Sequence, residues 1–64
     1  MTLIVTPNIS DPDGFYDELL VAHDGLDKAQ SDALNARLIL LLANHIGNRD
    51  TLRAAISAAQ NGSA

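Results

Sequence analysis

Residues 28–46 read KAQSDALNARLILLLANHI and include LILLLA at positions 38–43, the most apolar run of the chain. Apolar residues recur through this stretch at helical spacing, and Gly47 follows where the pattern stops. Positions 38–43 would be apolar around the whole circumference of the helix, and such a helix must be enclosed on all sides. We therefore expect a central helix over 28–46 that two neighbouring helices cover only in part, with another chain covering the remainder.

Start and stop signals predict a helix before the central one, over residues 12–24. Asp11 is a suitable N-cap acceptor, and Pro12 would occupy the first helical position, where no N–H donor is needed. Gly25 can adopt the left-handed conformation that ends a helix. The central helix has a start signal of its own, because Asp27 and Gln30 have the spacing of a capping box.

A third helix is predicted over residues 50–60, with Asn48 or Asp50 as its cap. It carries one narrow apolar stripe at helical spacing, formed by Leu52, Ala55, Ile56 and Ala59. Short loops favour antiparallel neighbours. The predicted fold is one all-α domain over 1–64, a small bundle made of a helical hairpin and a third helix, and we expect it to be oligomeric.

The two ends of the chain are predicted to lie outside the helices. Residues 1–10 contain the short apolar run Leu3-Ile4-Val5, closed by Pro7. They form either an extended arm over a helix pair or a neighbouring subunit, or a partly ordered tail. Residues 61–64 are predicted to be a frayed end.

Composition limits how so short a chain can be stabilised. Small domains usually rely on disulfides, a metal or oligomerisation. The chain has no cysteine, which excludes disulfides and thiolate zinc sites. Oligomerisation is therefore the favoured means of stabilisation, with a metal second.

Charge is divided unevenly between the two halves of the chain. Residues 11–32 hold seven acidic residues and one lysine, a net charge of −6, whereas residues 33–64 hold three arginines and one aspartate, a net charge of +2. A net charge of −4 disfavours general binding to nucleic acid. The opposite signs would help the first helix dock on the last, unless the acids simply complement helix dipoles.

No targeting or membrane segment is expected. The N-terminal residues lack the basic region and the long apolar stretch of a signal peptide. The apolar run at 38–43 is far shorter than the ~20 residues that cross a bilayer. We expect a cytoplasmic protein with no membrane contact.

Catalytic and metal-binding motifs are missing from the sequence. His23 and His45 are predicted at opposite ends of antiparallel helices, so a shared metal site is not expected. No serine lies in a nucleophile motif, and no glycine-rich phosphate loop is present. A chain this short is also expected to lack a pocket of ~300 Å³. We predict no enzymatic activity, no cofactor and no small-molecule substrate.

The central helix is the predicted site of interaction. Arg37 and Asn44 lie seven residues apart on one stripe with Leu41 between them. This polar stripe either fixes the register with a partner, as a buried asparagine does in coiled coils, or is the solvent-facing edge of the helix. The predicted interface comprises Arg37, Leu38, Leu41, Leu42, Asn44 and His45. The favoured function is a non-catalytic protein–protein interaction module that self-associates or docks on a larger enzyme.

Two alternative functions remain open. A small regulator would bind nucleic acid through the third helix, where Arg49 and Arg53 lie. An auxiliary enzyme subunit would instead place His45 or Arg37 in the active site of a larger partner.

The motif ALNARLILLLANHIG at 33–47, with DGFYDELL at 13–20, His23 and Gly25-Leu26, resembles a family of short bacterial proteins of unknown function. The resemblance covers most of residues 3–60 and implies a free-standing helical protein without an assigned activity. It also implies genes near flavin-dependent hydroxylases of aromatic catabolism. In size and helix pattern alone, the chain is similar to the small helical subunit of some ring-opening dioxygenases. These resemblances imply an auxiliary subunit as the alternative role and supply no catalytic residues.

Overall fold

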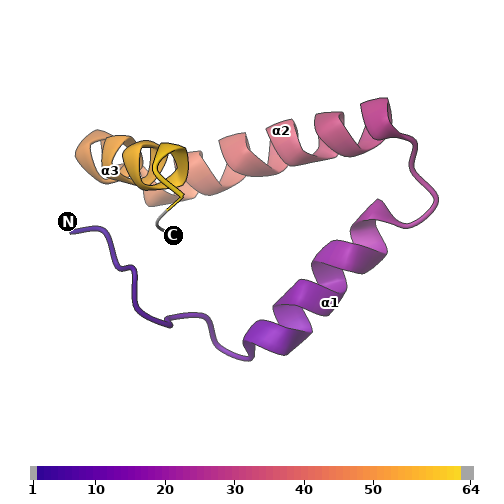
Figure 1. Ribbon diagram of the computed structural model, residues 1–64, viewed down its shortest axis with the longest axis horizontal. Helices are drawn as coiled ribbons and strands as arrows, with labels where there is room; N and C mark the ends of the chain where they lie inside the picture. The colour runs from indigo at the N-terminus through magenta and orange to yellow at the C-terminus, as the bar shows by residue number, and fades with distance from the viewer. Residues whose placement is uncertain (1, 63–64) are drawn as a thin grey trace.

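A computed structural model describes residues 2–62 of the chain, which contain three helices and no strand (Figure 1). The helices are α1 (Pro12–His23), α2 (Lys28–Ile46) and α3 (Arg49–Gln60). The all-α class is therefore confirmed. The central helix has the expected bounds, α1 ends one residue before the predicted range 12–24, and α3 begins one residue before the predicted range 50–60. Residues 1, 63 and 64 of the predicted arm and tail lie outside the described part of the chain.

The start of α1 uses the predicted cap. Asp11 has a φ of 50°, and its carboxylate accepts a hydrogen bond of 3.2 Å from the backbone N–H of Gly14. A Cβ atom at Gly14 would clash with the Asp11 carboxylate, which explains the glycine inside the first turn. The helix ends at His23. The cap residue Asp24 donates its N–H to the carbonyl of Val21, and Gly25 follows with a φ of 75°.

Both ends of α2 follow the sequence signals. The carboxylate of Asp27 accepts from the N–H of Gln30 at 2.8 Å, and the Gln30 side chain accepts from the N–H of Asp27 at 3.1 Å. These two bonds form the predicted capping box. At the other end, Gly47 has a φ of 73° and donates its N–H to the Ala43 carbonyl at 2.9 Å.

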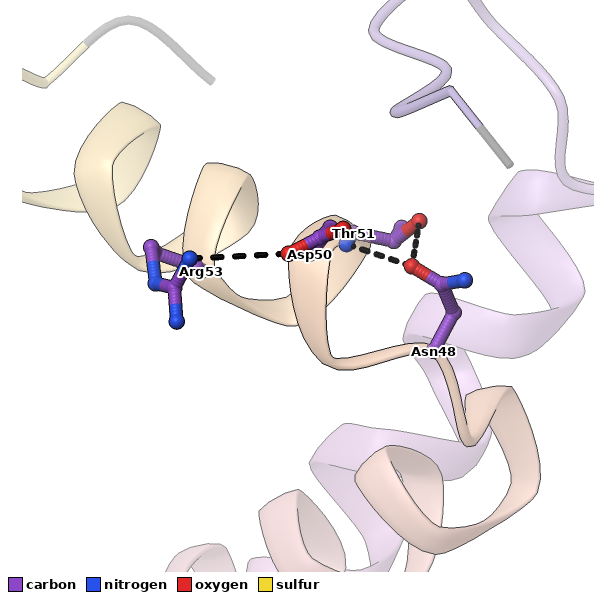
Figure 2. A network of polar contacts seen from close by, with 4 residues as sticks. All are labelled: Asn48, Asp50, Thr51 and Arg53. Atoms are coloured by element: carbon purple, nitrogen blue, oxygen red, sulfur yellow. Dashed lines mark hydrogen bonds and ion pairs between the residues drawn. The ribbon is translucent and has the colours of Figure 1, made fainter.

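Asn48, one of the two predicted candidates, caps α3 (Figure 2). Its side-chain oxygen accepts from the N–H of Thr51 at 2.8 Å and from the Thr51 hydroxyl at 3.0 Å. Thr51 is 7% exposed and is the one buried residue of the described chain. Asp50, the other candidate, instead forms an ion pair of 3.5 Å with Arg53.

The helices do not close into the predicted bundle. A turn at 24–27 joins α1 to one end of α2 at an open angle, and α3 lies at the other end of α2 (Figure 1). Among residues 2–62 no hydrophobic side chain is buried. The radius of gyration is 13.2 Å, whereas a compact domain of this length has about 11 Å. The expected packed hairpin is therefore wrong for the single chain, because α1 diverges from α2 (Figure 1) and no hydrophobic side chain is buried between the two helices within residues 2–62.

The accessible surface measures how open the chain is. It is 5529 Å², whereas a compact folded protein of this mass exposes about 4,000 Å². The excess is about 1,500 Å², part of which belongs to the extended N-terminal arm. Much of the surface is hydrophobic, including leucines and isoleucines of α2.

Gly47→Ala should lower the free energy of unfolding by about 1 kcal/mol, because an L-residue in the left-handed conformation is strained. Chemical denaturation at one fixed protein concentration measures the change. Gly62→Ala is the matched control, since Gly62 has a similar φ of 66° but follows the last helix. It should change the free energy of unfolding by less than about 0.5 kcal/mol. Equal effects at the two positions would contradict the prediction.

Asn48→Ala should destabilise the protein by about 1 kcal/mol, because it removes the acceptor for two Thr51 donors. Asn48→Asp keeps a capping oxygen and should retain most of the stability. Thermal unfolding of the two variants at the same concentration tests the cap. A loss of stability in the aspartate variant as large as in the alanine variant would show that capping is not the cause.

Candidate protein interface

An open groove separates α1 from α2. Its volume is about 330 Å³, and its walls are apolar except for Glu18 on α1 and Arg37 on α2. The expectation that the chain has no room for a pocket of about 300 Å³ is therefore wrong. The error has a simple cause, because the helices stand apart and do not close on each other. The groove is lined by Phe15, Glu18, Leu19, Ala22, Leu34, Arg37, Leu38 and Leu41.

A second open groove lies between α2 and α3 and has a volume of about 480 Å³. Every residue along it is aliphatic, so it offers no side-chain hydrogen bond or charge to a ligand. Leu42 is 50% exposed there and Ile56 is 61% exposed. The groove is lined by Ile39, Leu42, Ala43, Ile46, Leu52, Ala55, Ile56 and Ala59.

The outer face of α2, as we define it, comprises Arg37, Leu40, Leu41 and Asn44. Arg37 and Asn44 are seven residues apart and so lie within about 20° of each other around the helix. Leu40 and Leu41 lie on either side of the line that joins them, and each is 69% exposed. Arg37 and Asn44 are also exposed, and within residues 2–62 neither side chain makes a hydrogen bond or an ion pair.

The predicted interface residues occupy about 160° of the circumference of α2, in the order Asn44, Arg37, Leu41, His45, Leu38 and Leu42. Leu38 is half-buried in the α1–α2 groove, and Leu42 lines the α2–α3 groove. His45 is exposed in the last turn of α2. The other three lie on the outer face, and two of these, Arg37 and Leu41, also reach the edge of the α1–α2 groove. The six residues therefore form one arc of the helix, which runs from the outer face across the α1–α2 groove to the α2–α3 groove.

His23 has a role that the sequence reasoning missed. Its Nδ1 lies 2.8 Å from the Leu19 carbonyl oxygen, and its Nε2 lies 2.9 Å from the side-chain oxygen of Asn35 on α2. The Leu19 carbonyl can only accept, so the Nδ1–H donates to it, while Nε2 faces the side-chain amide of Asn35. His23 thus fixes the end of α1 against α2. No sequence signal could show this, since the contact depends on the angle between the two helices.

Charged side chains pair within single helices. Lys28 and Asp32 form an ion pair of 2.8 Å along α2, and Asp50 pairs with Arg53 on α3. Both pairs are exposed, and such pairs contribute about 0.3–0.5 kcal/mol each. In the part of the chain that the structure describes, no ion pair joins the acidic residues of α1 to the basic residues of α3.

Neither a metal-ligand cluster nor a membrane-spanning helix is present within residues 2–62. No group of three or more histidine, cysteine, aspartate or glutamate side chains is placed to hold a metal ion within residues 2–62. None of the helices in the same range has both the length and the apolar character needed to span a membrane.

The fold defines a small three-helix protein whose central helix is left largely uncovered. A family model described as "Protein of unknown function (DUF2783)" matches residues 3–61, and the chain belongs to this family. The match confirms the resemblance to a short family of unknown function. Searches of curated proteins and of solved structures found no match.

His23→Ala and Asn35→Ala should show a coupling of about 0.5–1.5 kcal/mol in a double-mutant cycle on the free energy of unfolding. The reason is that either substitution removes the same contact between α1 and α2. The control cycle pairs Asn35→Ala with His45→Ala, because His45 also ends a helix but has no contact with Asn35. A coupling in the first cycle no larger than in the control would mean that the contact does not stabilise the fold.

Proposed function

We propose that the protein is a non-catalytic protein–protein interaction module whose central helix is covered by another protein chain. The observation that carries the proposal is the exposure of α2, where Leu40 and Leu41 are each 69% exposed and no described hydrophobic residue is buried. Monomeric proteins rarely expose continuous apolar patches of more than a few hundred Å², and larger patches mark interaction surfaces.

The chemistry of the two grooves supports a protein partner over a small ligand. Small-molecule sites are concave and use a few converging polar groups to orient the ligand. The α2–α3 groove has only aliphatic walls, and the α1–α2 groove has one acidic and one basic residue. Apolar side chains at helical spacing on a partner helix suit such surfaces.

If the partner is an enzyme, the protein is an auxiliary subunit of that enzyme, which is the alternative function proposed from the sequence. Nucleic-acid binding through α3 has less support. Of the two basic residues of that helix, Arg53 is paired with Asp50, so Arg49 is the one left to bind nucleic acid. We therefore retain the interaction module as the proposed function.

The proposal predicts how the purified protein behaves in amide hydrogen exchange, dye binding and sedimentation. Either the protein associates and α2 is protected, or it is a monomer whose α2 exchanges fast and whose apolar surface binds a hydrophobic dye. A monomer with slow exchange in α2 and no dye binding would contradict the proposal, because the chain would then cover its own apolar surface.

Leu41→Ser should weaken association or, in a monomer, reduce dye binding, because it removes apolar surface from α2. Val21→Ser is the matched control, since Val21 is 71% exposed and lies on α1 between Asp17 and Asp24 at helical spacing. It should leave association and dye binding nearly unchanged. Equal effects of the two substitutions would count against α2 as the interaction surface.

A further inference from the structure

The outer face of α2 is symmetric about the point midway between Leu40 and Leu41. Arg37 and Asn44 lie at equal distances on either side of that point. If two α2 helices pair antiparallel around it, Arg37 of each copy lies level with Asn44 of the other. The guanidinium group can only donate hydrogen bonds, and the asparagine amide oxygen accepts them. Arg37 and Asn44 have no hydrogen-bond or ion-pair partner within residues 2–62 of their own chain, and in this pair they would form two equivalent contacts across the interface.

Charge favours the same orientation. α1 precedes α2 and α3 follows it, so an antiparallel pair brings α1 of one copy to the end where α3 of the other copy lies (Figure 1). α1 carries Asp13, Asp17 and Glu18, whereas α3 carries Arg49 and Arg53 against one aspartate. A parallel pair would place the two acidic helices at the same end, where like charges repel. Each chain therefore carries an acidic surface on α1 and a basic surface on α3, and the antiparallel pair brings the two together.

The exposed area is also sufficient for such a pair. The chain exposes 5529 Å², about 1,500 Å² more than a compact protein of its mass. A standard protein interface buries about 800 Å² on each partner. One interface of ordinary size fits within the excess, even with part of that excess assigned to the N-terminal arm.

We infer that the chain covering α2 is a second copy of this protein, with the two α2 helices antiparallel across a two-fold axis between Leu40 and Leu41. The inference rests on the proposed function and names the partner for the same surface. In this dimer the outer faces pack on each other, and acidic α1 of one copy lies next to basic α3 of the other.

Cysteine cross-linking tests the orientation, and the absence of native cysteine makes each introduced thiol unique. Leu40→Cys lies next to the proposed axis, so the dimer should form a disulfide across it on mild oxidation. Ala33→Cys is the matched control on the same helix. In an antiparallel pair its two copies are about 22 Å apart along the helices, too far for a disulfide. A disulfide at position 33 would indicate a parallel pair and overturn the inference.

Exchanging the polar pair tests the register. Asn44→Arg should raise the dissociation constant of the dimer by about tenfold, because it places two guanidinium groups opposite each other. Arg37→Asn should raise it by about threefold, because it replaces charged donors by a neutral amide. The double variant R37N/N44R restores one arginine opposite one asparagine and should associate within a few-fold of the original chain. Failure of the double variant to recover, with both single variants impaired, would overturn the register.

Sedimentation of the unmodified chain separates the failure of this inference from the failure of the proposed function. A dimer with the position-40 disulfide supports both. A monomer with a fast-exchanging, dye-binding α2 overturns the second copy as the partner but agrees with an interaction module. A monomer with a protected α2 overturns both, and a dimer that cross-links at neither position overturns the antiparallel arrangement.

Discussion

The whole structure depends on one constraint, which is that a helix apolar on every side cannot be enclosed by two short helices of its own chain. Residues 38–43 have no polar side to turn toward water. α1 and α3 border α2 on two sides through open grooves, Leu40 stays exposed on a third side, and Leu41 stays exposed although it lines the α1–α2 groove. The missing core, the large accessible surface and the proposed partner all follow from this mismatch between α2 and its neighbours.

Features coded by neighbouring residues could be predicted from the sequence. The Asp11 cap, the Asp27–Gln30 capping box and the stop at Gly47 each involve residues within four positions, and the structure has all of them. The angle between α1 and α2 could not be predicted, because it is set by turn geometry and by the His23–Asn35 contact across twelve residues. The closed hairpin was wrong for this reason.

The candidate interface was predictable only in outline. Periodicity identified α2 as the exposed apolar element, but it could not divide the residues of that helix among its neighbours. Leu38 and Leu42 turn toward different grooves, while Arg37 and Asn44 share the outer face. That division matters for function, because it separates side chains available to a partner from those that first meet their own chain. It also makes Leu40 part of the exposed surface, although the sequence-based set did not include it.

The helix caps have a consequence for the order of events during folding. The caps of all three helices and both ion pairs join residues three or four positions apart. Structure of such low contact order forms fast, on the scale of about a microsecond for a helix. Each helix can therefore appear and disappear many times before one chain meets another. If a second chain covers α2 as proposed, the encounter is the slow step, and the folded population then rises with the concentration of the partner.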